Sequence, residues 1–253
     1  MKLTERVRSK FSGAATFLKH SVGTPEQTRA WLDQPHQGMA KVLAEHQGRS
    51  VHKWMHFPDV YERYFAAYRG TNVHMLEIGV SHGGSIELWR KYFGENAVIF
   101  GVDIDPACAG RCDPPNQVRI GSQADPKFLR RVVAEMGAPD IILDDGSHVG
   151  EHQRVSFETL FPLLKDGGLY AIEDLHTAYW PGEWEGGYKR AGSGIEQVKQ
   201  MIDDMHGWYH DRPQTTSART EIGAIHVHDS IVVIEKAHRD PPTQITMGVP
   251  AKD

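Results

Sequence analysis

Two segments of the chain decide its fold, Asp140-Ile-Ile-Leu-Asp-Asp-Gly-Ser-His148 and Gly168-Leu-Tyr-Ala-Ile-Glu-Asp174. Each contains a short apolar run typical of a buried strand, and each run ends in acidic residues. Between the two runs, apolar residues recur at helical spacing: Phe157, Leu160, Phe161 and Leu164. The pattern indicates one β-α-β unit, and because such crossovers are right-handed, its two strands lie side by side and parallel.

The alternation of strand and helix patterns begins further upstream. Strands are predicted over residues 74–80, 98–104 and 118–120, and helices over residues 84–93 and 126–136. The second of these helices has a clear start signal, since Asp125 is a good N-cap and Pro126 suits the first helical position. The sequence therefore predicts a mainly parallel sheet whose strands are connected by helices.

The last third of the chain breaks this rhythm. Strand patterns over residues 222–228 and 231–235 are separated only by the turn formers Asp229 and Ser230. Strands connected so tightly are antiparallel, because a parallel connection needs about a dozen residues or more. Five parallel units finished by an antiparallel hairpin distinguish this α/β chain from a plain dinucleotide-binding fold.

Length and composition narrow the class of protein. The 253 residues are 40% hydrophobic, enough to bury one substantial core. The net charge of −5 and the lack of a dense Lys/Arg block argue against nucleic acid as a partner. No stretch reaches the roughly 18 apolar residues of a membrane span, and residues 1–19 lack the apolar segment of a signal peptide. We therefore expect a cytoplasmic protein.

The acidic residues at the two strand ends indicate a metal site. Asp145, Glu173 and Asp174 are expected to converge at one sheet edge, where open α/β sheets bind ligands. Three carboxylates packed together repel one another unless a cation lies between them, and hard oxygen ligands suit Mg²⁺. His148 follows the first of these acids by three residues and is a candidate general base.

A glycine-rich turn after the first strand indicates a cofactor site. The segment Glu77-Ile-Gly-Val-Ser-His-Gly-Gly-Ser85 joins the first strand to the first helix, where backbone amides can approach a ligand closely. Asp103 ends the next strand and can accept hydrogen bonds from ribose hydroxyls. The fingerprint G-x-G-x-x-G is absent, and with the terminal hairpin this favours S-adenosylmethionine over a nicotinamide cofactor.

The order of these patterns resembles the class I methyltransferases. That resemblance implies a Rossmann-like, seven-stranded sheet of order 3-2-1-4-5-7-6, with strand 7 antiparallel and helices on both faces. Residues 144–148 and 172–181 look more narrowly like metal-dependent sugar O-methyltransferases, which act on deoxysugars of macrolide and polyketide antibiotics. A mycobacterial methylmannose polysaccharide 1-O-methyltransferase is also similar. The resemblance covers about residues 53–236.

The resemblance implies an S-adenosylmethionine- and Mg²⁺-dependent enzyme that methylates a sugar hydroxyl of a glycan or glycoside, with the 1-hydroxyl of a methylated mannoside as one such acceptor. By motif, Asp145, Glu173 and Asp174 would bind the metal and His148 would be the base. Six residues would lie around the cofactor: Glu77, Gly79 and Ser81 at its methionine part, Asp103 at the ribose, and Gln123 and Asp144 near the adenine.

The chain divides by pattern into three regions. Residues 1–70 are predicted to be a helical extension, 71–239 the catalytic domain and 240–253 a loose tail. The extension carries an aromatic stripe: Tyr61, Tyr64, Phe65 and Tyr68. Such a stripe at helical spacing indicates a face packed on the core or on a second subunit rather than a ligand cage. A homodimer or higher homo-oligomer is expected.

Several alternatives remain open from the sequence. His176 competes with His148 for the role of base, and Glu77 and Asp144 have purely structural readings. Residues 177–189, rich in Trp, Tyr and Gly, are either a sugar-binding lid or an ordinary loop. Cys108 and Cys112 lack further zinc ligands and are expected to be unpaired thiols.

Three other kinds of protein remain in competition. A catechol-type O-methyltransferase would use a lysine base, and a nicotinamide oxidoreductase would need no metal. The third is a binding protein that keeps the fold without catalysis.

Overall fold

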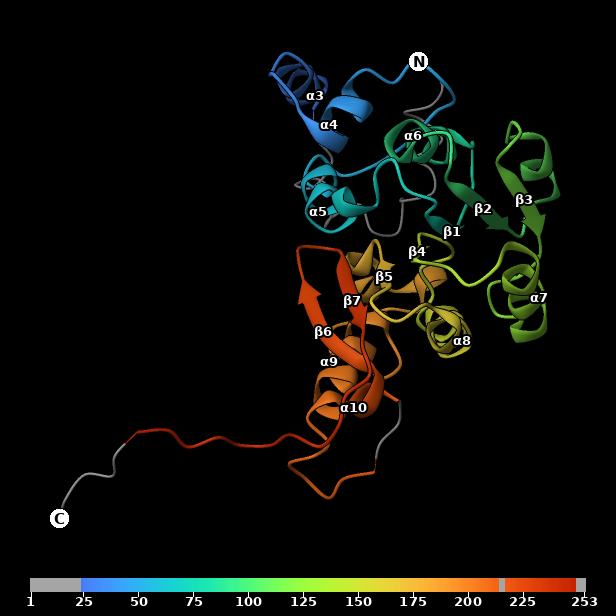
Figure 1. Cartoon of the computed structure of the whole chain (residues 1–253). Helices are drawn as coiled ribbons and strands as arrows, with labels where there is room; N and C mark the ends of the chain where they lie inside the picture. Colours follow the sequence, from blue (N-terminus) through green and yellow to red (C-terminus); the bar gives the residue numbers. More distant parts are fainter. Residues whose placement is uncertain (1–23, 214–216, 249–253) are drawn as a thin grey trace.

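The computed structural model describes residues 24–213 and 217–248 of the chain. Its centre is a seven-stranded sheet of order β3-β2-β1-β4-β5-β7-β6 (Figure 1). The strands are β1 (His74–Ile78), β2 (Val98–Asp103), β3 (Gln117–Ile120), β4 (Ile141–Asp144), β5 (Leu169–Ile172), β6 (Ile222–Val227) and β7 (Val232–Lys236). The predicted strand order is confirmed.

The directions of the strands also follow the prediction. β1 pairs in parallel with β2 and β4, β2 with β3, and β4 with β5. β7 is antiparallel to both β5 and β6. The hairpin turn includes Ser230, whose φ of 65° is the left-handed conformation that tight hairpin turns require.

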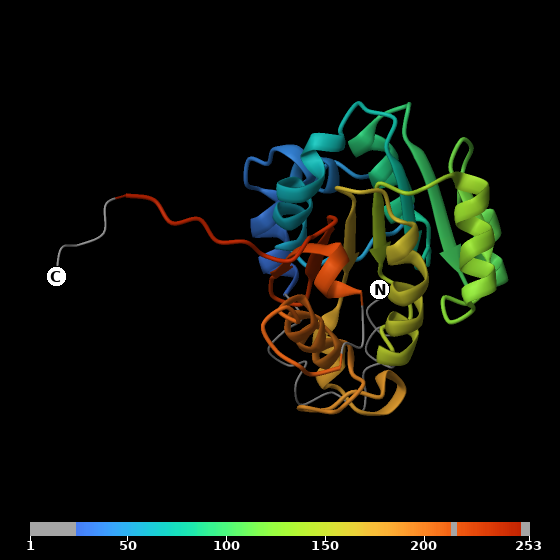
Figure 2. The same ribbon diagram turned by 60° about the horizontal axis from the view of Figure 1, so that its bottom comes forward.

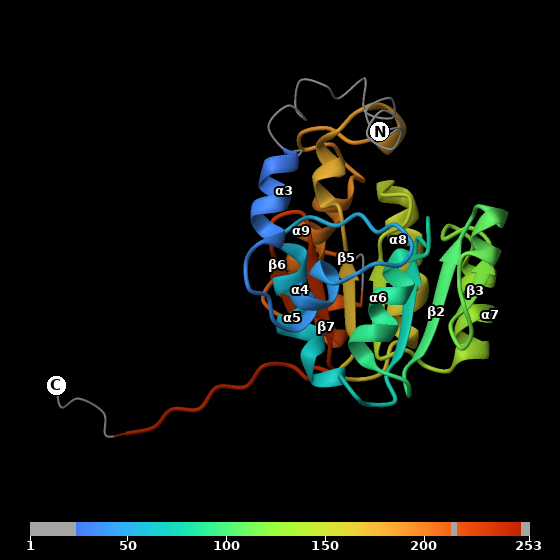
Figure 3. The same ribbon diagram turned by 90° about the horizontal axis from the view of Figure 1, so that it is seen from above.

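Helices cover both faces of the sheet. They are α3 (Pro25–Leu32), α4 (Gly38–Ala44), α5 (Phe57–Phe65), α6 (Gly84–Phe93), α7 (Pro126–Met136), α8 (Gly150–Leu160), α9 (Gly194–Met205) and α10 (Ala218–Glu221). One apolar core packs α7 to α10 on the sheet, and a second packs α4 to α6 on the opposite face. Figures 2 and 3 show these two layers with the strands between them.

Two helix starts show why the sequence folds in this way. The Asp125 carboxylate accepts hydrogen bonds from the backbone N–H groups of Lys127 and Phe128, as the predicted N-cap of α7 should. Thr24 and Gln27 form a capping box at the start of α3. These caps satisfy amides that the first turn of a helix leaves without a partner.

One predicted helix is shorter than expected. The pattern through Leu164 predicted a single helix, but α8 ends at Leu160 and a tighter 3₁₀ turn, Phe161–Leu163, follows. Pro162 explains the change, because proline has no N–H with which to continue the α-helical hydrogen bonds. Phe157 and Phe161 nevertheless stack on each other in the core, with ring centroids 4.7 Å apart.

The aromatic stripe of the N-terminal region packs on the core, as predicted. Tyr61 and Phe65 are each 1% exposed, and both lie edge-on to the Trp89 ring of α6. Residues 240–248 form no helix or strand and lead away from the body of the molecule (Figure 1). The predictions for residues 1–19 fall outside the described part of the chain.

Two further expectations bear on the described residues. Both cysteines are free: Cys108 is buried and Cys112 is partly exposed. None of the helices in the described ranges is long and apolar enough to cross a membrane.

Candidate active site

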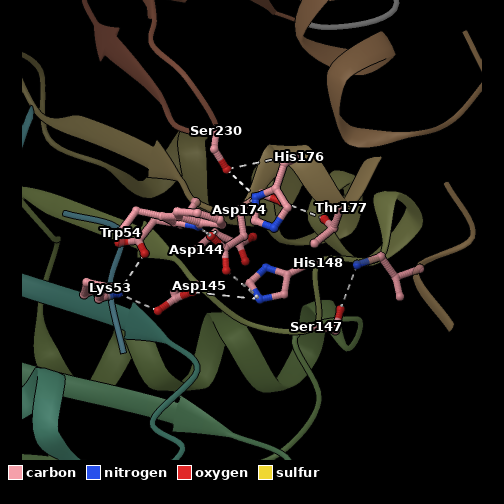
Figure 4. A network of polar contacts seen from close by, with 12 residues as sticks. Lys53, Trp54, Asp144, Asp145, Ser147, His148, Asp174, His176, Thr177 and Ser230 are labelled. Atoms are coloured by element: carbon pink, nitrogen blue, oxygen red, sulfur yellow. Dashed lines mark hydrogen bonds and ion pairs between the residues drawn. The ribbon is translucent and has the colours of Figure 1, made fainter. Parts of the chain in front are cut away.

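The acidic residues that follow β4 and β5 meet at the carboxyl edge of the sheet. Asp144 of β4 and Ile172 of β5 are paired across the two strands, so Asp145 and Glu173, the residues that follow them, leave the sheet at the same height. Asp145, His148 and Asp174 each offer a ligand atom, and these atoms all lie within 4.8 Å of one another (Figure 4). The predicted convergence of Asp145 and Asp174, with His148 beside them, is therefore present in the structure.

Two of these three residues have unusual backbone conformations. His148 has a φ of 59° and Asp174 a φ of 54°, both in the left-handed region. Such conformations cost free energy in residues other than glycine and cluster at functional sites. Here they direct both side chains inward: His148 Nε2 lies 3.6 Å from Asp174 Oδ2 and 3.9 Å from Asp145 Oδ1.

Glu173, predicted as the third metal ligand, faces another way. Its carboxylate is 1% exposed and accepts hydrogen bonds from Lys53 Nζ at 2.7 Å and from the Tyr61 hydroxyl. Burial raises the pKa of Glu173, and the nearby Asp145 raises it further, while Lys53 opposes both effects. In the structure both of its oxygens are engaged within the protein. The role of Glu173 as a metal ligand stays a prediction.

Lys53 was not anticipated as part of the site. Its Nζ lies 2.5 Å from Asp145 Oδ2 as well as 2.7 Å from Glu173 Oε2, and its side chain is only 3% exposed. Burial alone would lower the pKa of Lys53, but Asp145, Glu173 and Glu77 more than offset this and raise it. In this structure Lys53 is therefore the charged partner of two acids.

Two aromatic residues of the same region also reach the acids. Trp54 Nε1 donates to Asp174 Oδ1 at 3.0 Å, and Tyr61 contacts Glu173 from α5. The sequence offered only a weak signal for this role, since Tyr61 belonged to a stripe whose spacing indicated packing alone. Lys53 and Trp54 lie in a segment with no helix or strand periodicity.

His176, the competing base, lies next to the site but outside the group of three. Its Nδ1 is 2.5 Å from Ser230 Oγ and 3.8 Å from Asp174 Oδ1. Burial lowers the pKa of His176, although Asp174 partly opposes this effect. Its ring packs edge-on against those of Trp54 and Trp180. This places His176 as a wall of the site beside Asp174.

The glycine-rich turn after β1 lies directly against the acidic loop. Gly79 has a φ of 98°, and a Cβ there would come 2.0 Å from the backbone oxygen of Asp145. Only glycine allows this close approach. Ser81 also has a positive φ, of 49°, in an exposed position of the turn. The predicted cofactor turn and the predicted metal loop are thus neighbours.

Asp103 holds the glycine-rich turn from the end of β2. Its Oδ2 accepts hydrogen bonds from the N–H groups of Val80 and Ser81, and its Oδ1 accepts one from Asp105, each at 2.9 Å. Burial works to raise the pKa of Asp103, but these three amides outweigh it and lower the pKa. The half-buried carboxylate stays ionised at the position predicted for ribose binding.

Three other residues predicted to contact the cofactor are buried within the protein. Glu77 is fully buried and accepts hydrogen bonds from Ser85 and Trp89, and burial raises its pKa to about 7. Asp144, also fully buried, is held by Gln123 and by neighbouring hydroxyls. Direct contact of Glu77, Gln123 and Asp144 with the cofactor stays a prediction; in the structure each side chain is hydrogen-bonded to other protein groups.

The residues present fit both implied groups. Asp145 and Asp174 supply the hard oxygen ligands that Mg²⁺ prefers, and the short distances within the group are appropriate to a shared cation. Gly79 lets the turn of backbone amides approach a ligand, and Asp103 stands at the strand end beside it.

The aromatic segment that follows β5 begins directly after Asp174. It contains two 3₁₀ turns, Leu175–Tyr179 and Gly182–Trp184, and the N–H groups of Gly186 and Gly187 donate to Trp180 and Ala178 carbonyls. Its tip is open to solvent, since Tyr188 is 79% exposed. The segment is therefore anchored at its base, and a role for it as a sugar-binding lid stays a prediction.

The strand order, the antiparallel β7 and the glycine-rich turn define the class I methyltransferase fold. Comparison with known families agrees: residues 76–175 match the family described as a methyltransferase domain. The chain therefore carries a methyltransferase domain, as the sequence patterns predicted.

The relatives are sugar O-methyltransferases. The chain is 37% identical to the 8-demethyl-8-(2-methoxy-alpha-L-rhamnosyl)-tetracenomycin-C 3'-O-methyltransferase of Streptomyces olivaceus, over 81% of this chain and 55% of that protein. It is 33% identical to the corresponding 2'-O-methyltransferase of the same organism, over 83% of this chain and 62% of that protein. The chain thus spans little more than half the length of these relatives.

A solved structure is also similar. It is the MycE methyltransferase of the mycinamycin biosynthetic pathway, in complex with Mg, SAH and mycinamycin VI. The TM-score is 0.67 and the identity 34%, with 72% of this chain and 49% of that chain covered. The predicted resemblance to metal-dependent sugar O-methyltransferases is confirmed.

Proposed function

We propose that this chain is an S-adenosylmethionine-dependent, divalent-metal-dependent O-methyltransferase that acts on a sugar hydroxyl of a glycoside. The observation that carries the proposal is the group Asp145, His148 and Asp174, held beside the glycine-rich turn at the carboxyl edge of the sheet. The proposed ligands are Asp145 and Asp174, and Glu173 stays the predicted third ligand although Lys53 and Tyr61 engage its oxygens in the structure. Asp103 would hold the cofactor ribose.

Each bound group would supply one part of the chemistry. A divalent ion lowers the pKa of a hydroxyl that it binds, and S-adenosylmethionine provides an electrophilic methyl group. The remaining tasks belong to the protein. Asp145 and Asp174 would hold the ion beside the glycine-rich turn, and they would thereby help to orient a bound acceptor toward the cofactor.

His148 is the proposed proton acceptor. Its Nε2 points toward Asp145 and Asp174, the two proposed ligands, so it faces the place where the acceptor hydroxyl would bind. Its Nδ1 is buried and has no hydrogen-bond partner among residues 24–213 and 217–248. His176 is the weaker candidate, because its Nδ1 is engaged by Ser230 and its pKa is lowered by burial.

The relatives support a glycoside acceptor. Their names place methyl transfer on rhamnosyl groups of tetracenomycin C, and MycE was solved with a macrolide, mycinamycin VI. A polysaccharide acceptor, including the 1-hydroxyl of a mannoside, stays a prediction from the sequence. So do the homo-oligomer and the cytoplasmic location. We also propose that the catalytic unit extends upstream of residue 71, since Lys53 reaches the acids.

The test is a methyl-transfer assay with S-adenosylmethionine and a panel of acceptors, followed by mass spectrometry. A rhamnosylated polyketide should be methylated, while its aglycone and a simple catechol should not. Dialysis against EDTA should abolish turnover and Mg²⁺ should restore it. Turnover that is unaffected by chelation would contradict the metal requirement. Thermal stabilisation by NAD but not by S-adenosylhomocysteine would contradict the assignment of S-adenosylmethionine as the cofactor.

A further inference from the structure

Lys53 occupies an unusual position between two acidic side chains. Its ammonium group bridges Asp145 Oδ2 at 2.5 Å and Glu173 Oε2 at 2.7 Å, and the Tyr61 ring lies 6.0 Å away. The other oxygen of Asp145 faces His148. Asp145 therefore contacts both Lys53 and the proposed metal site formed with His148 and Asp174. Glu173 contacts Lys53 but is not part of that site.

The position of Lys53 is fixed by the segment that precedes it. The Arg49 guanidinium donates to Glu87 of α6 at 2.6 Å and to Asp113 of the β2–β3 loop at 2.6 Å. The backbone N–H of Arg49 also donates to Glu87 at 2.9 Å. The chain is thus clamped four residues before Lys53, and the ammonium group is held in place rather than sampling solvent.

The charge of Lys53 matters because the surrounding carboxylates are close together. Asp145, Glu173 and Asp174 carry three negative charges when ionised, and Lys53 reduces the sum to two, which a single divalent ion balances. An uncompensated buried carboxylate such as Glu173 is costly. A fixed ammonium group stabilises Glu173 before any metal binds, but it also repels an incoming cation.

We propose that Lys53 is a positioning residue of the metal site, a built-in cation that pairs with Glu173 in the metal-free protein and weakens the binding of a divalent ion. The inference rests on the metal site proposed above. The expected change in metal affinity on loss of Lys53 is opposite in sign to that expected for a merely structural lysine. Loss of a structural lysine would disorder the site and weaken metal binding, whereas loss of this charge strengthens it.

The experiment uses metal-free protein titrated with Mn²⁺ by calorimetry. Lys53→Met should lower the Mn²⁺ dissociation constant by about tenfold or more, because one nearby positive charge is removed. It should also lower the melting temperature in EDTA and enlarge the stabilisation that Mn²⁺ provides. The matched control is Lys165→Met, which breaks a half-exposed lysine–aspartate pair with Asp140 far from the site. The control should leave the Mn²⁺ affinity unchanged.

The double variant Lys53→Met/Glu173→Gln keeps the test decisive. It removes both charges of the buried pair, so it should recover the melting temperature and return Mn²⁺ affinity toward that of the wild type. If Lys53→Met alone is insoluble, the double variant should still fold, and failure to recover would overturn the proposal. Equal or weaker Mn²⁺ binding by Lys53→Met would also overturn it. Absence of Mn²⁺ binding in every variant would overturn the metal site itself.

Discussion

The two sides of the proposed active site are built differently. The acidic side comes from loops at the ends of β4 and β5, the central strands of the sheet, and it holds Asp145, Glu173 and Asp174. The opposite side comes from the irregular segment before α5 and from α5 itself, and it supplies Lys53 and two aromatic donors. The sheet provides the charges, and the N-terminal region provides the groups that stabilise them.

This difference has an energetic meaning. The acidic side alone is electrostatically unfavourable, because like charges at short distance destabilise the folded state. The donor side offsets part of that cost through one ammonium group, one indole N–H and one phenol (Figure 4 labels the first two donors, Lys53 and Trp54). Substitutions on the acidic side should therefore remove activity, whereas those on the donor side should mainly change stability and metal affinity.

The largest effect is expected from Asp145→Asn. The change keeps the shape of the side chain but removes the charge that both the metal and Lys53 require. Turnover should fall by about 10³-fold or more, comparable to the loss of a principal electrostatic group in other enzymes. The control is Asp166→Asn in an exposed turn, which should retain wild-type turnover. Near-normal activity of Asp145→Asn would remove the acidic side from the mechanism.

His148→Ala should lower kcat by roughly 10²–10⁴-fold, the range for the loss of a general base. The wild-type rate should rise with pH, because a general base accepts a proton only when it is unprotonated, and this rise should disappear in the variant. The Mn²⁺ affinity of the variant shows whether His148 is a base or a metal ligand. Loss of a base should leave metal binding unchanged, whereas loss of a ligand should weaken metal binding. Should His176→Ala abolish turnover and His148→Ala not, the two assignments are reversed.

The sequence predicted the meeting of Asp145 and Asp174, with His148 beside them, for a physical reason. Strand periodicity and the handedness of β-α-β units place the ends of neighbouring strands together, so Asp145, His148 and Asp174 could be brought together without a structure. The same reasoning predicted the strand order and the hairpin. The predicted helix through Leu164 was wrong at its C-terminal end, because Pro162 lacks the N–H that would continue the helix, whereas the apolar spacing continues past it.

The donor side was not predictable in this way. Lys53 lies in a segment without periodicity, and its place depends on the Arg49 contacts with Glu87 and Asp113, residues distant in sequence. Tyr61 was correctly predicted to pack in the core, but spacing cannot show where a buried phenol finds its acceptor. For Glu77 and Asp144 the motif suggested a role that the structure does not show. Their positions in the motifs suggested contacts with the cofactor, but both side chains are buried and hydrogen-bonded to other residues of the protein.

Asp103→Ala should weaken S-adenosylmethionine binding by about 1.5–3 kcal/mol, the scale of hydrogen bonds to a charged group. The carboxylate also holds the amides of Val80 and Ser81, so the variant loosens the glycine-rich turn. Calorimetry with S-adenosylmethionine measures the change, and Asp105→Asn, at the exposed position two residues on, is the control. Unchanged affinity would leave Asp103 with a structural role only.

Tyr61→Phe tests the buried part of the donor side. The substitution removes one hydroxyl and leaves one oxygen of Glu173 without its partner in a site that water does not reach. The free energy of unfolding should fall by about 1–3 kcal/mol, the cost of an unsatisfied buried group. Urea denaturation measures the loss, with Tyr64→Phe as a control on a partly buried phenol that contacts His228 instead. A smaller loss for Tyr61 than for Tyr64 would contradict the argument.

Trp54→Phe should give the smallest loss of stability, and it tests most directly how the donor side differs from the acidic side. It removes the indole N–H that donates to Asp174 at 3.0 Å but keeps an aromatic ring next to His176. The Asp174 side chain is 23% exposed, so water can replace the lost donor, and the stability loss should be about 0.5–1.5 kcal/mol. Because the indole N–H fixes one oxygen of a proposed ligand, Mn²⁺ affinity should change only a few-fold. A loss as large as that of Tyr61→Phe would mean that Asp174 is sealed from solvent, and that the donor side closes over the metal site.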